Sequence, residues 1–224
     1  GRSVALHLAA RGHNIALQYC RSRESAEQTA KEVRNFDVQC KTYCADFTDF
    51  NSTPLLMDQV LADFKSIDLL INSAANFIQK KIEETSNSEL LDTININLIA
   101  PFILMREFKK KVNNGLIINI LDERILRRVS TFGAYSVSKS ALAHLTELSA
   151  VSWGETVRVN GIAPGLILPP AGSSGEYLLE KAPNIPTKTH GNTSDILSGI
   201  DYLLDNPFVN GEILFIDGGE SKKS

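Results

Sequence analysis

Residues 115–121 read Gly-Leu-Ile-Ile-Asn-Ile-Leu, a nearly continuous apolar run of strand length. Residues 67–72, Ile-Asp-Leu-Leu-Ile-Asn, have the same character. Strands that are buried on both faces have such sequences, and they belong to parallel sheets covered by helices. Both runs lie between stretches with helical periodicity. This alternation predicts an α/β fold, in which a doubly wound parallel sheet has right-handed crossovers and helices on both faces.

The same alternation extends outward over the 224 residues of the chain. Further strands are expected at residues 14–19, 38–45, 157–163 and 212–217. Helices are expected from about residue 4 to 11 and at 22–34, 52–64, 86–111, 132–153 and 193–204. Neither a repeat nor a linker interrupts this order. Residues 1–224 are therefore expected to form one Rossmann-type domain.

The beginning of the chain departs from this architecture. In a doubly wound sheet, the first helix follows a strand and a glycine-rich turn. Here Gly1-Arg2-Ser3 runs directly into a helical stretch. We therefore expect Gly1 to be the last glycine of a nucleotide-binding turn whose strand is not in this sequence. Without that strand, backbone groups in the middle of the sheet would lack partners across a gap.

Composition and charge argue against several classes of protein. Hydrophobic residues make up 43% and charged residues 22%, as in globular domains. The net charge of −3 differs from that of a typical nucleic-acid-binding protein. No apolar run approaches the ~20 residues of a membrane span, so we expect neither a nucleic-acid nor a membrane partner. Three cysteines without a CxxC pair favour a reducing cytoplasm, and the histidines lack metal-ligand spacing.

The most informative polar motif is Tyr135-Ser-Val-Ser-Lys139. Residues four apart share one face of a helix. An ammonium group beside a phenol stabilises the phenolate, which lowers the tyrosine pKa from about 10 toward neutrality. Such a tyrosine can act as a general acid or base. Taken alone, a surface pair on a helix would be the simpler interpretation.

Four further motifs accompany this pair, and together they resemble the short-chain dehydrogenase/reductase family over Gly1–Gly219. They are Leu70-Ile-Asn72-Ser-Ala-Ala75, Ile96-Asn97-Leu-Ile-Ala-Pro-Phe102, Val159-Asn160-Gly-Ile-Ala-Pro-Gly165 and Phe215-Ile-Asp-Gly-Gly219. The resemblance implies that Tyr135 donates a proton and that Asn97 holds a water on a relay between Lys139 and solvent. It also implies a homotetramer, built partly on the helices at 86–111 and 132–153.

One position departs from the general family pattern. A serine usually stands thirteen residues before the tyrosine, where this chain has Asp122. An aspartate there is similar to the pteridine reductase branch, and Phe77 falls where that branch stacks a phenylalanine on the pterin ring. The resemblance implies a substrate site of Phe77, Asp122, Tyr135 and Leu168. A lid is expected over about residues 166–191.

The chemistry of a pterin C=N bond suits these groups. Its reduction needs a hydride at carbon and a proton at nitrogen, and Tyr135 would donate the proton. Asp122 could accept a hydrogen bond from Tyr135 or, if protonated, help to replenish the proton. An ionised Asp122 raises the Tyr135 pKa, against the effect of Lys139.

The end of the strand expected at residues 14–19, which is the second strand of a complete doubly wound sheet, indicates which cofactor is bound. NAD-preferring sheets usually carry an acidic residue there, but this chain has Cys20-Arg21-Ser22-Arg23. Arg21 and Ser22 suit a 2′-phosphate through charge-assisted hydrogen bonds, so NADPH or NADP is expected. The resemblance implies further cofactor contacts from Gly1, Asp46, Phe47, Asn72, Ala74, Tyr135, Lys139, Pro164, Gly165 and Ile167.

The sequence thus predicts a cytoplasmic, NADPH-dependent reductase whose small-molecule substrate is a pterin or folate of the dihydrofolate, dihydrobiopterin or dihydromonapterin class. Two alternatives remain. One is a short-chain reductase of another carbonyl compound, such as a 3-oxoacyl thioester, and Asp122 and Phe77 argue against it. The other is a non-catalytic NADPH-binding module. The presence of Asn97, Tyr135 and Lys139 argues against that reading.

Overall fold

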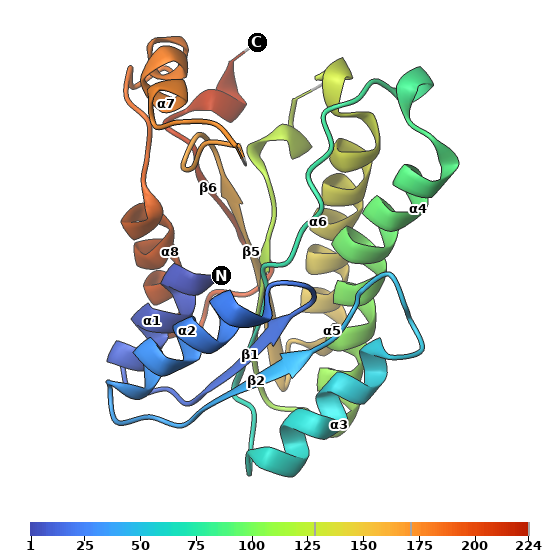
Figure 1. Cartoon of the computed structure of the whole chain (residues 1–224), viewed down its shortest axis with the longest axis vertical. Helices are drawn as coiled ribbons and strands as arrows, with labels where there is room; N and C mark the ends of the chain where they lie inside the picture. Colours follow the sequence, from blue (N-terminus) through green and yellow to red (C-terminus); the bar gives the residue numbers. More distant parts are fainter. Residues whose placement is uncertain (128, 171, 224) are drawn as a thin grey trace.

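The computed structural model describes residues 1–127, 129–170 and 172–223, and it has the expected Rossmann-type α/β fold (Figure 1). Its strands are β1 (Ile15–Tyr19), β2 (Cys40–Cys44), β3 (Leu69–Asn72), β4 (Gly115–Ile120), β5 (Val157–Pro164) and β6 (Ile213–Ile216). Its α-helices are α1 (Arg2–Ala10), α2 (Arg23–Arg34), α3 (Thr53–Asp63), α4 (Asn87–Ile94), α5 (Ala100–Lys111), α6 (Gly133–Trp153), α7 (Glu176–Lys181) and α8 (Thr193–Asp205). Most ends lie within two residues of the prediction, whereas α7 was not predicted.

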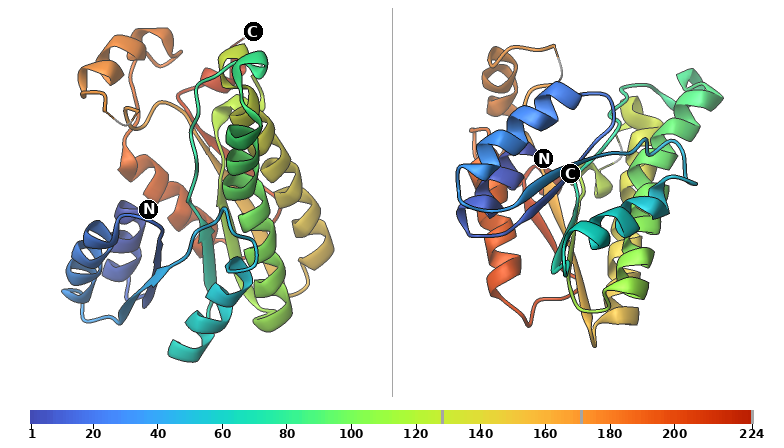
Figure 2. Two further views of the ribbon diagram at one scale, coloured as in Figure 1. Left: turned by 45° about the vertical axis from the view of Figure 1, so that its right-hand side comes forward. Right: turned by 60° about the horizontal axis from the view of Figure 1, so that its bottom comes forward.

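The strands form two parallel sheets, one with the order β1-β2 and the other with the order β3-β4-β5-β6. Consecutive residues of both β1 and β3 line a cavity of about 830 Å³, among them 16–18 and 69–72. Because successive side chains of a strand point to opposite faces, lining by consecutive residues means that strand edges border the cavity. Figure 2 shows the β1-β2 layer standing apart from the larger sheet. The cavity between β1 and β3 lies where the sheet was expected to lack a strand.

Strand β4 carries the centre of the core. Leu116 and Ile118 pack in a cluster that includes Ile200 of α8, whereas Ile117 packs in a cluster with Phe108 of α5. Alternate residues of one strand therefore face different helical layers. This arrangement explains why residues 115–121 are apolar almost without interruption.

The helix predicted at 86–111 is interrupted. A π-helical turn, Asn95–Ile99, separates α4 from α5. Pro101 lies just beyond this turn, and it has no N–H group to donate to the carbonyl of Asn97, four residues earlier. A π-turn is one way for a helix to accommodate a missing backbone hydrogen bond. Such turns are frequent at functional sites.

Contrary to the sequence analysis, the stretch Asn87–Lys111 is long and apolar enough to cross a membrane by length and composition alone. Within the domain, α5 packs against α3 and α6. A core helix of a soluble protein meets the same two measures.

Candidate active site

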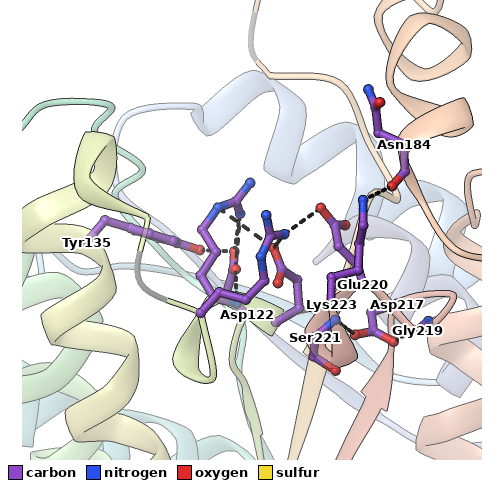
Figure 3. A network of polar contacts seen from close by, with 11 residues as sticks. Asp122, Tyr135, Asn184, Asp217, Gly219, Glu220, Ser221 and Lys223 are labelled. Carbon is purple, nitrogen blue, oxygen red and sulfur yellow. Dashed lines mark hydrogen bonds and ion pairs between the residues drawn. The ribbon is translucent and has the colours of Figure 1, made fainter.

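The predicted catalytic groups meet at the carboxyl end of the larger sheet, where α/β proteins bind ligands. Asp122 follows β4 by two residues, while Tyr135 and Lys139 lie in the first two turns of α6. All three residues are buried. Figure 3 shows the side chains of Asp122 and Tyr135 pointing toward one another.

Asp122 accepts hydrogen bonds from two other residues. The hydroxyl of Tyr135 lies 2.9 Å from Oδ2, and the backbone N–H of Arg124 donates to Oδ1 over 2.9 Å. Nη1 of Arg124 lies 3.0 Å from both carboxylate oxygens. The carboxylate is therefore fixed by its own loop and turned toward the phenol.

The surroundings of Tyr135 keep its hydroxyl protonated. Burial raises the pKa of Tyr135, and the charge and hydrogen bond of Asp122 raise it further. Lys139 does not offset this effect in the structure. Its Nζ donates to the carbonyl of Ile120 over 2.7 Å and lies 6.0 Å from the centre of the Tyr135 ring. The pKa of Lys139 is lowered to about 8 by burial. The lowering of the tyrosine pKa that the motif suggested is therefore not found.

Phe77 contributes an aromatic surface to the site. Its ring is 44% exposed and meets the Tyr135 ring edge-on, with 4.8 Å between the ring centres. The Phe132 ring lies 5.2 Å away at an angle of 38°. An exposed ring beside the proton donor is placed to contact a flat substrate.

Asn97 fastens the loop that carries Phe77. Its Oδ1 accepts from the backbone N–H of Asn76 over 2.7 Å, and its Nδ2 donates to the Asn76 carbonyl and to Ser138 Oγ over 2.9 and 3.0 Å. Its side chain thus joins the π-turn, the Phe77 loop and α6. The predicted relay water remains a prediction.

Gly133 provides a second attachment for this loop. Its N–H donates to the carbonyl of Lys80 over 2.9 Å. A Cβ atom at this position would lie 2.8 Å from Cγ1 of Ile82, so a larger residue would push the loop away from α6. The glycine therefore permits the close approach that places Phe77 edge-on to Tyr135.

Asn72 uses its side chain inside the protein. Its Nδ2 donates to Oδ1 of Asn119 over 2.7 Å, and Nδ2 of Asn119 donates to Thr146 Oγ1 over 2.8 Å. This buried chain joins β3, β4 and α6 directly behind the site.

The residues predicted to hold a 2′-phosphate lie at the end of β1. Arg21 and Ser22 are exposed, and Ser22 is the N-cap position of α2 without a side-chain capping bond. Within the described part of the chain, neither side chain forms a hydrogen bond to another residue. Both are thus free to meet an anion.

The remaining predicted cofactor residues border the same end of the fold. Gly1 precedes α1, and Ala74 is exposed just after β3. Asp46 accepts from the N–H and hydroxyl of Thr48 over 2.9 and 2.8 Å, and these bonds lower its pKa. Phe47 packs in a buried cluster, so its side chain offers little surface to a ligand.

The turn after β5 carries the last group of predicted contacts. Pro164 ends the strand, and a Cβ atom at Gly165 would lie 2.7 Å from Cα of Asp217. Ile167 packs against the core, whereas Leu168 is 66% exposed. The predicted lid contains α7, and residue 171 of that range lies outside the described residues.

The sequence analysis missed Arg124 and Glu123, which have no signal beyond following Asp122. Glu123 is 1% exposed; its Oε1 accepts from Arg127 over 3.1 Å, and Arg127 also pairs with Glu220 over 2.6 Å. Its Oε2 has no partner in the described part of the molecule. Burial, with the nearby charge of Glu220, raises the pKa of Glu123 to about 7. Figure 3 shows this network reaching the C-terminal turn.

Among residues 1–127, 129–170 and 172–223, no three His, Cys, Asp or Glu side chains are grouped as metal ligands would be.

A parallel sheet with a buried Tyr-x-x-x-Lys pair behind its carboxyl end defines a Rossmann-type oxidoreductase. The chain belongs to the short-chain dehydrogenase/reductase family, and residues 1–221 match the family model described as enoyl-(acyl carrier protein) reductase.

Three similar proteins illustrate the breadth of this family. The 3-oxoacyl-[acyl-carrier-protein] reductase FabG of Staphylococcus aureus is 26% identical over 229 residues, covering 98% of this chain and 92% of that protein. FolM alternative dihydrofolate reductase 1 from Brucella canis, solved with NADP, is 25% identical with a TM-score of 0.92, covering 100% and 90% of the two chains. A blue fluorescent protein from a metagenomic library, solved with NADPH, is 27% identical with a TM-score of 0.89, covering 98% and 93%.

Proposed function

We propose that this enzyme reduces a C=N bond of a pteridine ring with NADPH. The observation that carries the proposal is the constellation of Asp122, Tyr135 and Phe77. The carboxylate and the phenol are 2.9 Å apart, and the half-exposed aromatic ring lies 4.8 Å from the ring of the proton donor. Likeness to an alternative dihydrofolate reductase over the whole chain supports the same substrate class.

The protein binds NADP(H), and three of its structural neighbours were solved with NADP or NADPH. Its own residues fit the cofactor. Arg21 and Ser22 present an exposed guanidinium and a hydroxyl group at the start of α2, where a 2′-phosphate would be held. Gly1 precedes α1, whose N-terminus suits the pyrophosphate because helix N-termini attract anions.

When bound, NADPH supplies the hydride. Tyr135 donates the proton to the nitrogen atom, because its raised pKa keeps the hydroxyl protonated at neutral pH. Asp122 orients this hydroxyl through the hydrogen bond that it accepts. Lys139 and Asn97 are buried, and a water held between them and solvent would return the proton to Tyr135.

A second candidate function is the reduction of a 3-oxoacyl thioester. The observation that favours it is the FabG relative, which covers nearly the whole chain. In this reaction Tyr135 would protonate a carbonyl oxygen instead of a ring nitrogen. Asp122 and Phe77 have no evident task in that reaction.

The deciding experiment follows NADPH oxidation at 340 nm with a 7,8-dihydropterin, with a 3-oxoacyl thioester and without substrate. We expect turnover with the dihydropterin. The variant Asp122→Ser should lose pterin reduction while any weak thioester reduction persists or rises. Efficient thioester turnover by the unaltered protein, with none on the pterin, would contradict the proposal.

We further propose that the enzyme is a cytoplasmic homotetramer. Exposed apolar side chains on α4, α5 and α6 support the assembly; they are Leu90, Leu91, Phe102, Val137, Leu148 and Val151. Sedimentation analysis of the unaltered protein tests it, and a monomer at micromolar concentration would contradict it.

A further inference from the structure

The side chain of Arg124 occupies the middle of the proposed substrate site. Its guanidinium carbon lies 4.6 Å from the centre of the Phe132 ring and 5.9 Å from that of Phe77. Its Nη1 atom lies 3.0 Å from both oxygens of Asp122. One flat, positively charged group thus contacts both aromatic rings and the carboxylate beside the proton donor.

The contacts of the Arg124 guanidinium are not needed to hold the loop at residues 122–127 together. The backbone N–H of Arg124 already fixes Asp122, and the hydroxyl of Tyr135 binds the other carboxylate oxygen. Another residue, Arg127, ties the loop to the C-terminal segment through Glu123 and Glu220. The guanidinium is therefore an additional occupant, 25% exposed in its side chain and able to leave toward solvent.

The chemistry of a guanidinium indicates what could replace it. The group is planar, carries its N–H donors in the plane, and stacks on aromatic faces. An aminopyrimidine or pterin ring combines the same features, because its N–C–N unit is flat and bears N–H donors at its edge. A 3-oxoacyl thioester has neither a flat ring nor such an edge.

We propose that the side chain of Arg124 occupies, on Asp122 and the two phenylalanine rings, the place of the flat, N–H-bearing edge of the substrate. A heterocycle with that edge displaces the side chain when it binds. Ligands without that edge must also displace the side chain but cannot replace its bonds to Asp122, so they bind more weakly. The proposal rests on the proposed pteridine substrate and names the feature of that substrate which the site selects.

The test measures binding, so that it does not depend on turnover. Binding of 2,4-diaminopyrimidine to the NADP-loaded enzyme is measured by calorimetry, with 2,4-dimethoxypyrimidine as the matched ring without N–H donors. Arg124→Ala should bind the diamino compound roughly tenfold more tightly, because the ligand no longer has to break a charge-assisted hydrogen bond between Arg124 and Asp122. The dimethoxy compound should gain by a similar factor but remain the weaker ligand in both proteins, because it cannot donate to Asp122.

Two further variants separate the loss of the N–H groups from the loss of side-chain volume and from the loss of a positive charge elsewhere in the loop. Arg124→Met keeps an apolar chain over the rings but removes the N–H groups, and it should show the same gain. Arg127→Ala removes a guanidinium of the same loop that does not contact Asp122, and it should bind both compounds as the unaltered protein does. With a dihydropterin substrate, Arg124→Ala should lower KM.

Weaker binding of the diamino compound by Arg124→Ala and Arg124→Met would overturn the proposal, since Arg124 would then be a direct contact. Equal affinity of the two compounds for Arg124→Ala would also overturn it, because the vacated place would then not require N–H donors. Failure of the pteridine function would instead be seen in the turnover assay, with the binding pattern unchanged.

Discussion

The hydroxyl of Tyr135 donates a hydrogen bond to the carboxylate of Asp122 over 2.9 Å, although the two residues are thirteen positions apart in the chain. A negative charge at this distance opposes ionisation of the phenol. Together with burial, it places the pKa of Tyr135 above its ordinary value. The site is thus built to deliver a proton, and the lysine expected to favour the phenolate is bound to the carbonyl of Ile120 instead.

Replacing Tyr135 by phenylalanine tests this donor directly. Tyr135→Phe removes the hydroxyl and leaves the ring that contacts Phe77, so the cofactor should bind as before. Turnover should fall by ~10²–10⁴-fold, the usual contribution of a general acid. Steady-state kinetics and NADPH titration of the same preparation measure the two effects. Turnover close to that of the unaltered enzyme would mean that another group, with Asp122 the nearest candidate, donates the proton.

Cofactor preference is expected to depend on Arg21 and Ser22. The double variant Arg21→Ala/Ser22→Ala removes the groups that would contact the 2′-phosphate, and each lost charge-assisted bond costs about 1.5–3 kcal/mol. NADPH should therefore bind at least about tenfold more weakly. NADH lacks this phosphate, so its affinity should change little. Dissociation constants for both cofactors check the expectation, and an equal loss for both would exclude the assignment.

The role of Phe77 can be separated from packing because its ring is 44% exposed. A fully buried phenylalanine would cost ~3–5 kcal/mol of stability when truncated to alanine. For this half-exposed ring, Phe77→Ala should cost only about 1 kcal/mol, while kcat/KM for the pterin falls roughly tenfold through lost stacking and contact area. NADPH affinity should be preserved. Thermal melting and pterin kinetics decide, and a large melting loss with unchanged kinetics would make Phe77 a packing residue.

The fold could be predicted from sequence because its causes are local and periodic. Residues 115–121 are apolar on both faces, and the structure buries Leu116 and Ile117 against different helical layers. The meeting of Asp122 and Tyr135 was predictable as well, since the family spacing places Asp122 just after strand β4 and Tyr135 at the start of helix α6. Both the fold and this pair can therefore be predicted from the order of residue types along the chain.

Other features depend on choices that the sequence pattern does not display. Lys139 could bind the phenol or a carbonyl, and only packing selects the carbonyl of Ile120. Arg124 looked like any exposed arginine, because nothing in its neighbours indicates two aromatic rings brought from residues 77 and 132. The π-turn around Asn97 had one sequence signal, Pro101, which the helical periodicity of 86–111 concealed.

Glu123 predicts how stability depends on pH. Its carboxyl group is 1% exposed, and burial with the nearby charge of Glu220 raises its pKa from 4.5 to about 7. For an acid with a raised pKa, the folded protein binds a proton that the unfolded chain releases. The resulting stabilisation is complete below pH 4.5 and is lost as the pH rises through about 7. This difference between the unfolded and folded pKa of Glu123 corresponds to about 3 kcal/mol in the free energy of unfolding.

The variant Glu123→Gln keeps an oxygen acceptor for Arg127 and cannot ionise. Between pH 4.5 and 8 the unaltered protein should therefore lose stability relative to this variant, by several degrees in Tm. Glu220→Gln serves as the matched control, because removing its charge lowers the Glu123 pKa and should make the decline smaller. Melting curves of the three proteins across this range measure the effect. If the curves of the unaltered protein and Glu123→Gln run parallel, Glu123 does not titrate in the folded state over this range, and the unpartnered Oε2 must be satisfied by solvent.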